Sequence, residues 1–391
     1  MGIEGQITIA LRTGHGRVVG VDIRSSRPLH APRIFVGRSP AAVLETLPMI
    51  YSLCATAQAA AARQALGAAL GRAPDAAAAA GRLLVDVETV REHTLGILLG
   101  WAEYLGEGPD PAAATMVRLL PAVREAIFAE GRAFALDATV AVDHQALDAA
   151  LGEMMAVLEE RVFGLPVAAW HGLATPGELA AWAGQGTTVA ARVVAAAMDD
   201  PAPGTTAEGV PLLPDLDDAT LGARLRPAGA DAFIARPRWQ GAPAETSSLS
   251  RRRAHTLVAC LLESHGDALA TRLVARLAEL SALAIGLETA LPGLADAPSA
   301  AAGEGRVRGE GIGQVEAARG RLVHRVELAA GAVTRYQVLA PTEWNFHPEG
   351  AAARALTGLA FTDQDDLRRR AALTIRALDP CVGFELVVDG G

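Results

Sequence analysis

Close to its C-terminal end the chain reads Arg376-Ala377-Leu378-Asp379-Pro380-Cys381-Val382-Gly383-Phe384-Glu385-Leu386-Val387. Pro380 fixes its own φ angle and disfavours the α region for Asp379, so the sequence predicts that the helix containing Arg376 ends here. Cys381 should then project from a rigid turn, which suits a metal ligand because the ligand is held in place before the metal arrives. A lone cysteine, however, is usually a small buried apolar residue. Whether Cys381 is a ligand therefore depends on a partner elsewhere in the chain.

The composition is typical of a helix-rich globular protein with a large core. Of the 391 residues, 51% are hydrophobic and only 4% are aromatic, and alanine dominates. No linker divides the chain, so we expect a single domain over residues 1–391. The formal net charge of −9 argues against nucleic acid or an anionic membrane as a partner.

Cysteine usage and targeting signals indicate a cytoplasmic protein. The three cysteines are too few and too scattered for a disulfide framework, so we expect a reducing compartment. Met1 to Gly5 contain neither a basic stretch nor an apolar core and do not resemble a signal peptide. No uninterrupted apolar run reaches the roughly 20 residues that a membrane-spanning helix needs.

Residue patterns predict an α-rich α+β fold. Residues 6–11 and 17–23 alternate apolar with polar side chains, which predicts two strands. A hairpin is predicted from 321–328 and 332–339, which flank a short glycine-containing loop. Helices are predicted at residues 41–70, 86–105, 111–132, 144–161, 176–199 and 250–288, and later at about 349–358 and 363–377. The sequence leaves open whether 72–81 form a helix or a loop, and it predicts a surface loop at 200–218.

Three further features have ordinary structural interpretations when they are taken alone. Cys54 lies in the predicted helix 41–70, and its surroundings of alanine favour helix packing. Cys260 lies in the middle of the predicted helix 250–288, and we assign it to the core. Gly311 and Gly313 have a spacing found in phosphate-binding loops, but no strand–loop–helix pattern surrounds them, so we reject that interpretation.

The C-terminal motifs, in their order, resemble the large subunit of nickel-iron hydrogenases. Members of that family read G-x-G-x-x-E-A-P-R-G, then a hairpin ending in Y-Q, then P-S/T-T-W-N, then D-P-C-x-x-C-x-x-H. This chain reads G-x-G-x-x-E-A-A-R-G over 311–320, then Tyr336-Gln337, Pro341-Thr342-Glu343-Trp344-Asn345 and Asp379-Pro380-Cys381. Upstream, Glu245-Thr246-Ser247-Ser248-Leu249-Ser250-Arg251 is similar to the family's E-T-G-P-L-A-R, while Gly37-Arg38-Ser39-Pro40 and Cys54 match in relative position. The resemblance implies a large-subunit-like fold with a long helical core, a small N-terminal β element and a C-terminal β-hairpin.

The chain departs from the family at its metal ligands. The family holds nickel and iron with four thiolates, two from R-x-C-G-x-C near the N-terminus and two from the C-terminal C-x-x-C. Alignment puts Tyr51 and Cys54 at the first pair of positions, and Cys381 and Phe384 at the second pair. Two thiolates cannot complete the four-sulfur cage, so nickel binding in the family's manner is not expected.

Two more departures argue against hydrogen activation. Val387 falls where the family has its C-terminal histidine. The family's R-I-E-G-H is reduced to Arg12-Thr13-Gly14-His15, which lacks the acidic residue that relays protons. The resemblance therefore implies a protein that is not an enzyme.

The chain keeps residues that surround the iron in the family. There the iron carries cyanide and carbon monoxide, and its cyanides accept hydrogen bonds from the A-P-R and P-S/T-T segments. Arg319 and Thr342 match those segments, and both side chains can donate to anionic ligands. The resemblance thus implies that Cys54 and Cys381 lie side by side as metal ligands, and that Arg319 and Thr342 bind a transient Fe(CN)2CO group without nickel.

This pattern is similar to the HupK/HoxV type of hydrogenase maturation protein. These relatives of the large subunit are thought to be scaffolds that hold the iron group before its transfer, and two thiolates suit a cargo that must also be released. We therefore expect a maturation scaffold whose partners are maturation chaperones and an immature hydrogenase large subunit. The alternatives are a non-catalytic pseudo-large-subunit that docks to an iron–sulfur partner, an active hydrogenase with unusual ligands, and a helical protein whose thiols never meet. Whether any histidine assists iron binding stays open for His15, His324 and His347.

Overall fold

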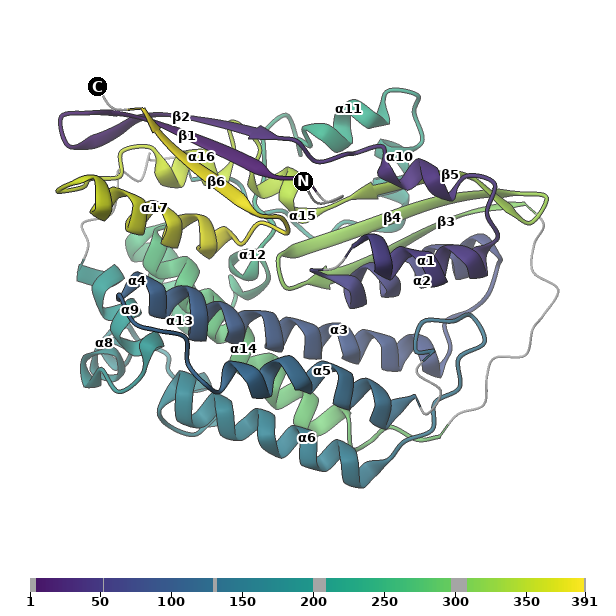
Figure 1. The fold of residues 1–391 in the computed structure, drawn as a ribbon, viewed down its shortest axis with the longest axis horizontal. Coiled ribbons are helices and arrows are strands. Elements are labelled where there is room, and N and C mark those ends of the chain that lie inside the picture. Colours follow the sequence, from purple (N-terminus) through teal and green to yellow (C-terminus); the bar gives the residue numbers. More distant parts are fainter. Residues whose placement is uncertain (1–4, 52, 129–131, 200–208, 297–307, 390–391) are drawn as a thin grey trace.

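An alanine-rich helix, α2 (Ala55–Ala69), lies between a sheet and a layer of long helices (Figure 1). The structure is a computed structural model that describes residues 5–51, 53–128, 132–199, 209–296 and 308–389. The small side chains of α2 let strand β3 (Gly309–Ala317) lie directly against the helix backbone. A Cβ atom at Gly311 would collide with the carbonyl oxygen of Ala65. The glycines at 311 and 313 are therefore packing residues on a strand, which agrees with the rejection of a phosphate loop.

The C-terminal sheet has the strand order β3-β4-β5, and its neighbouring strands are antiparallel. Strands β4 (Gly320–Ala329) and β5 (Ala332–Leu339) form the predicted hairpin, which is confirmed. The third strand, β3, was not predicted, because its three glycines at alternate positions lack the β-branched side chains that indicate a strand.

The second sheet joins the two ends of the chain in the order β2-β1-β6. The two predicted N-terminal strands are confirmed as β1 (Ile7–Gly14) and β2 (Arg17–Ser25), which pair antiparallel. Strand β6 (Phe384–Asp389) was not predicted, and it lies parallel to β1 with Ile7 opposite Phe384. This pairing places the turn that precedes β6 beside the segment that follows β2.

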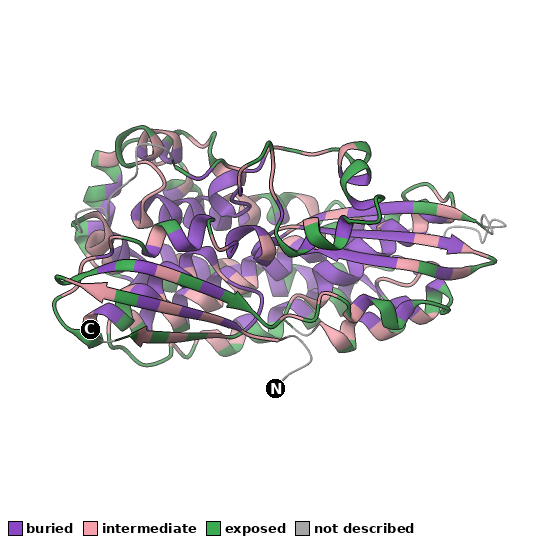
Figure 2. Cartoon of the chain, turned by 90° about the horizontal axis from the view of Figure 1, so that it is seen from above, coloured by how far each residue is buried: buried purple, intermediate pink, exposed green. Residues whose placement is uncertain are grey.

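The long helices α3, α5, α6 and α14 form a layer below the two sheets in Figure 1, and viewed from above the sheets lie side by side over this layer (Figure 2). Buried apolar side chains of these helices form the largest core cluster. The helices other than α2 are α1 (Pro40–Ile50), α3 (Ala76–Leu95), α4 (Ala102–Tyr104), α5 (Ala113–Ile127), α6 (His144–Val157), α7 (Val167–His171), α8 (Pro176–Gln185), α9 (Val189–Asp199), α10 (Asp218–Leu225), α11 (Ala230–Ala235), α12 (Ser248–Arg252), α13 (Thr256–His265), α14 (Leu269–Ala290), α15 (Pro341–Asn345), α16 (Ala351–Leu356) and α17 (Gln364–Leu378). Short 3-10 or π-helical segments are present at Ala31–Phe35, Gly96–Trp101 and Leu158–Phe163.

Several predicted helices are confirmed in type but wrong in extent. The helix predicted at 41–70 is two helices, α1 and α2, because the chain leaves helical geometry between Tyr51 and Cys54. The helix predicted at 250–288 is three, α12 to α14, and that predicted at 176–199 is α8 and α9. The undecided segment 72–81 contains the start of α3, which Asp75 caps by accepting a hydrogen bond from the Ala78 N–H.

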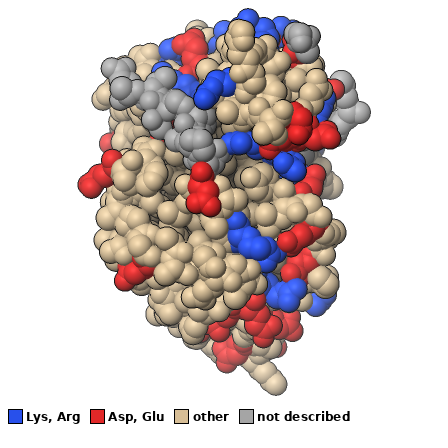
Figure 3. All heavy atoms as spheres, turned by 90° about the vertical axis from the view of Figure 1, so that its left-hand side faces the viewer, with Lys and Arg blue, Asp and Glu red and all other residues tan. Residues whose placement is uncertain are grey.

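Some predictions fall partly outside the described residues. Of the surface loop predicted at 200–218, residues 200–208 lie outside them, and so do residues 129–131 of the helix predicted at 111–132. Among the described ranges, no helix combines the length and apolar character needed to cross a bilayer. The face shown in Figure 3 mixes acidic and basic side chains without a continuous basic surface.

Candidate functional site

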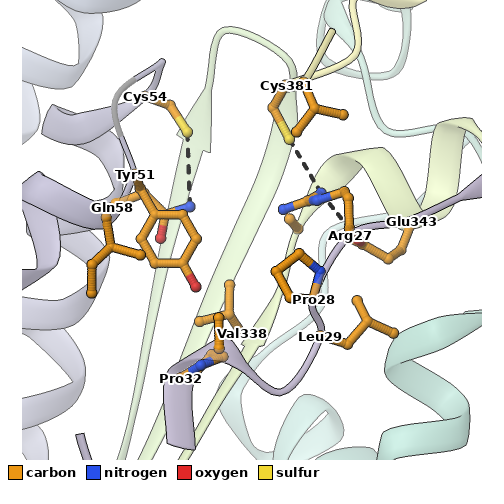
Figure 4. A pocket seen from close by; sticks show the side chains of 14 residues that line it. Arg27, Pro28, Leu29, Pro32, Tyr51, Cys54, Gln58, Val338, Glu343 and Cys381 are labelled. Atoms are coloured by element: carbon orange, nitrogen blue, oxygen red, sulfur yellow. Dashed lines mark hydrogen bonds and ion pairs between the residues drawn. The ribbon is translucent and has the colours of Figure 1, made fainter. Parts of the chain in front are cut away.

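Cys54 and Cys381 line the same small pocket (Figure 4). Cys54 is the residue that precedes α2, and Cys381 lies in the turn between α17 and β6. The pocket has a volume of about 30 Å³, and its lining also includes Arg27, Tyr51 and Glu343. The structure thus brings together the two cysteines that the sequence analysis named as ligands.

Cys381 is held where α17 ends. Asp379 adopts the left-handed conformation with φ of 49°, and with Pro380 it turns the chain out of the helix, as the sequence predicts. The Thr342 hydroxyl on α15 lies 2.6 Å from the Cys381 sulfur and accepts a hydrogen bond from the Cys381 N–H at 3.2 Å. Arg27 donates from Nη1 to the same sulfur at 3.2 Å. The buried thiol therefore has a fixed position and two polar neighbours.

Cys54 is connected to a chain of three buried polar side chains. Gln58 Nε2 lies 3.7 Å from the Cys54 sulfur, and Gln58 Oε1 lies 2.8 Å from His324 Nε2. His324 Nδ1 in turn lies 2.8 Å from the Tyr336 hydroxyl. Burial lowers the pKa of His324 to about 3, so the ring is neutral near pH 7 and donates one hydrogen bond while accepting one. The arrangement is satisfied when Tyr336 donates to His324, His324 donates to Gln58, and Gln58 donates to the Cys54 sulfur.

The charges around Cys54 favour a protonated thiol unless a cation is present. Burial raises the pKa of Cys54, and the negative charges of Cys381 and Glu88 raise it further. The Glu88 carboxylate accepts hydrogen bonds from the N–H groups of Thr56 and Ala57 at 2.9 and 3.0 Å, which satisfies the first turn of α2. A metal ion that binds the Cys54 sulfur would therefore have to displace its proton.

Arg27 is a residue of this pocket that the sequence analysis missed. It follows β2, its side chain is largely shielded from solvent, and it forms an ion pair with Glu343 at 3.0 Å. Burial alone would lower the pKa of Arg27, but the charges of Cys381 and Glu343 raise it. A single arginine after a strand carries no recognisable motif, so no sequence signal marks it.

Arg319 lies near the two cysteines without lining their pocket. Burial would lower its pKa, whereas Asp379, Glu92 and then both cysteines raise it. Nη2 donates to Glu92 at 2.9 Å, but Nε and Nη1 are buried and have no hydrogen-bond acceptor among the described residues. Nε lies 3.6 Å from Asp379 Oδ2 and forms an ion pair with it, so Nη1 is the nitrogen whose N–H groups are unused among the described residues.

Asn345 links three of the motifs that the sequence analysis matched. Its Oδ1 accepts a hydrogen bond from the Thr246 N–H at 2.9 Å. Its Nδ2 donates to the carbonyl oxygens of Thr246 at 2.8 Å and of Arg319 at 3.2 Å. Three segments that are distant in sequence are therefore joined beside the cysteine pocket.

The remaining aligned positions lie partly inside and partly outside the pocket. Tyr51 lines it, and burial raises the pKa of its hydroxyl to about 12. Phe384 begins β6 and pairs with Ile7, and it does not line the cysteine pocket. Val387 lies on the same strand and is partly exposed.

The histidines considered as ligands do not line the pocket. His15 is exposed in the turn between β1 and β2. Both ring nitrogens of His324 have partners. His347 is buried beside a neighbouring cavity of about 290 Å³, where its Nε2 has no partner. Within the described residues, no group of three or more His, Cys, Asp or Glu side chains is arranged to hold a metal ion.

The assignment of Cys260 to the core is wrong. Cys260 is partly exposed on α13, whereas its neighbours Leu257, Val258 and Leu261 are buried. The residue lies at the margin of the apolar stripe that faces the core, and an apolar sequence window alone does not distinguish the margin from the centre.

Comparisons with known proteins identify the family of this chain. A family model described as nickel-dependent hydrogenase matches residues 242–384. The hydrogenase expression/formation protein HupK of Azotobacter vinelandii is 34% identical over 391 residues, which cover 99% of each chain. HoxV of Cupriavidus necator, with the same description, is 34% identical over 94% of this chain and 92% of its own. The chain belongs to the HupK/HoxV family of hydrogenase expression/formation proteins.

The fold of this HupK/HoxV-family protein is that of hydrogenase large subunits. The nickel-iron-selenium hydrogenase of Desulfovibrio vulgaris Hildenborough matches with a TM-score of 0.68 at 18% identity, over 94% of each chain. That of Desulfomicrobium baculatum matches with a TM-score of 0.66 at 15% identity, over 95% of each chain. The predicted α-rich α+β, large-subunit-like fold is confirmed.

Proposed function

We propose that this protein acts in hydrogenase maturation as a scaffold that transiently holds an Fe(CN)2CO group for transfer to an immature nickel-iron hydrogenase large subunit. The observation that carries the proposal is the meeting of Cys54 and Cys381 in one pocket, without further protein ligands among the described residues. Two thiolates bind iron, while the diatomic ligands of the cargo occupy its other coordination positions. Incomplete coordination by the protein suits a group that must later leave.

The donors around the sulfurs suit the chemistry of this cargo. Cyanide bound to iron is an anionic acceptor, and charge-assisted donors bind such acceptors strongly. Arg319 Nη1 is buried and has no acceptor among the described residues, and a buried donor left unpaired is unfavourable. Arg27 and Thr342 place further donors at the Cys381 sulfur.

The pocket is too small to accept the iron group in its present form. A cavity of about 30 Å³ has room for about two water molecules, which is less than iron with three diatomic ligands requires. Side chains must therefore move when the cargo enters. Leu29 lines both this pocket and the neighbouring cavity of about 290 Å³, which gives its side chain room to move.

The competing function is that of a pseudo-large-subunit, which docks to an iron–sulfur protein and carries no iron group. This function gives the cysteine pocket no role. A pseudo-large-subunit would bind an iron–sulfur partner permanently, whereas the scaffold meets maturation chaperones and its target only transiently. The retained thiols and the unpaired Arg319 donors favour the scaffold. The residues at the other two aligned ligand positions favour a non-catalytic protein. Tyr51 and Phe384 stand there in place of thiol ligands that nickel needs.

Transfer of labelled iron tests the proposed function. The protein is produced with the hydrogenase maturation genes in medium containing isotopically labelled iron, purified without oxygen, and mixed with metal-free hydrogenase large subunit and a maturation chaperone. We expect the label to move to the large subunit. Protein that carries no label, or that instead purifies in a stable one-to-one complex with an iron–sulfur protein, would contradict the scaffold.

A further inference from the structure

Arg27 places a permanent positive charge inside the pocket that Cys54 and Cys381 line. Its Nη1 is 3.2 Å from the Cys381 sulfur and 3.0 Å from Glu343 Oε1, so the guanidinium lies between a thiol and a carboxylate (Figure 4). Tyr51, which aligns with a thiolate that the family uses and this chain lacks, lines the same pocket. Arg27 and Tyr51 are close enough for the charge of Arg27 to lower the pKa of the Tyr51 hydroxyl, against the larger effect of burial.

The charge on Arg27 persists under all physiological conditions, because arginine in proteins is not deprotonated. The Arg27 and Glu343 side chains are 10% and 6% exposed, so solvent screens their charges only weakly. A bare divalent cation bound at Cys381 would lie within a few ångströms of this guanidinium, and like charges at such a distance repel. Iron that already carries two cyanides does not meet the same repulsion, because ferrous iron and two cyanides sum to zero charge.

We propose that Arg27 is a specificity-determining residue, whose guanidinium excludes bare divalent cations from Cys54 and Cys381 and admits an iron group that carries its own anionic ligands. The second part of this statement rests on the proposed function, whereas the first part concerns the metal-free protein alone. Glu343 is a positioning residue in this account, because it holds the guanidinium beside the sulfur. A cyanide nitrogen can also accept a hydrogen bond from Arg27, which a bare cation cannot do.

Arg27 has two opposite effects on the binding of a metal ion at Cys381. Arg27 attracts the thiolate form of Cys381, which would help any metal to bind, and it repels the metal itself. The proposal requires repulsion to dominate for bare cations, since the ion carries two charges and the thiolate one. Removal of Arg27 should therefore strengthen the binding of a bare divalent cation.

The experiment is a titration of metal-free, reduced, full-length protein with Co²⁺, followed by the absorption of cobalt–thiolate bonds. The variants are Arg27→Leu, which keeps much of the side-chain volume and offers no metal ligand, and the double variant Arg27→Leu with Glu343→Gln. Arg24→Leu is the matched control, because Arg24 is exposed and pairs with Asp22 outside the cysteine pocket. Circular dichroism establishes that each variant is folded, and the double variant avoids leaving a buried carboxylate unpaired.

We expect both variants that lack Arg27 to bind Co²⁺ at least about tenfold more tightly than wild type, and Arg24→Leu to bind as wild type does. Equal or weaker binding by the Arg27 variants would overturn the proposal. A gain in Arg27→Leu that is absent from the double variant would also overturn it, because the freed Glu343 carboxylate would then be the cause. These results do not depend on the cargo, so failure of the iron-transfer experiment and failure of this inference are distinguishable.

Discussion

Thr342 contacts Cys381 twice, with its hydroxyl oxygen 2.6 Å from the sulfur and 3.2 Å from the backbone nitrogen. The sequence analysis assigned Thr342 only to the cargo, but in the structure it holds the cysteine itself. A hydroxyl has a single hydrogen to donate, so Thr342 donates either to the sulfur or to a ligand of the iron. Its first role is therefore to position Cys381.

Replacement of Thr342 by valine should loosen Cys381. Valine has a similar shape but leaves the Cys381 N–H without its acceptor, and an unpaired buried donor costs about 1–3 kcal/mol. We expect the free energy of unfolding, measured in urea, to fall by about this amount. Thr342→Ser retains the hydroxyl and is the control. Equal stability of Thr342→Val and wild type would show that the two contacts do not hold the cysteine.

His324 should make stability depend on pH. Its folded-state pKa of about 3 lies below the ordinary value of 6.5, so the folded protein prefers the neutral ring. This contribution is complete above about pH 6.5 and is lost as the pH falls toward about 3, with a slope of up to about 1.4 kcal/mol per pH unit.

The comparison of wild type with His324→Gln between pH 7 and pH 4 isolates this contribution from that of the carboxylates. The wild type should lose stability more steeply with falling pH than the variant. Parallel pH profiles for wild type and His324→Gln would contradict a neutral, buried His324.

Local signals account for what the sequence predicted. The Asp379-Pro380 step predicts the end of α17 and the exit of Cys381, because both effects depend on neighbouring residues alone. The pairing of Cys54 with Cys381 follows only from aligned motifs, since no local pattern relates residues so far apart in the chain.

Features that depend on distant contacts were not predictable from the pattern. Strand β6 is short and is completed by parallel pairing with β1 at the other end of the chain. Arg27 enters the cysteine pocket because of the path that the chain takes after β2. The glycines of β3 are needed because this strand lies against the backbone of α2. The exposure of Cys260 depends on how α13 rotates against the core. Each of these features depends on a contact with a segment that is distant in the sequence.

Addition of a single methyl group at the contact between β3 and α2 should destabilise the protein. Gly311→Ala would drive a Cβ atom into the backbone of α2, and overpacking of this kind costs about 1–3 kcal/mol or more. Gly67→Ala is the matched control, because that glycine lies on α2 with open space around it. We expect thermal unfolding to show a destabilised Gly311→Ala and a Gly67→Ala that gains about 0.5–1 kcal/mol. Equal stability of the two variants would contradict the close packing.

Arg319 should affect the cargo without affecting the capacity to bind it. Its unpaired N–H groups are suited to cyanide, which is more basic and more anionic than carbon monoxide. We therefore expect Arg319→Lys to shift or weaken the cyanide bands in the infrared spectrum more than the carbonyl band. Equal shifts of all bands would indicate a general change in the iron rather than a lost hydrogen bond.

The most direct test of the scaffold is the infrared spectrum of protein purified without oxygen from cells that express the hydrogenase maturation genes. Cyanide and carbon monoxide bound to iron absorb where protein itself does not. We expect these bands in wild type and in Cys260→Ser, and their loss in Cys54→Ser and in Cys381→Ser, because a hydroxyl is a poor replacement for a thiolate ligand. Absence of the bands from wild type while the partner genes are active would contradict the scaffold, and bands that persist in both cysteine variants would place the iron elsewhere.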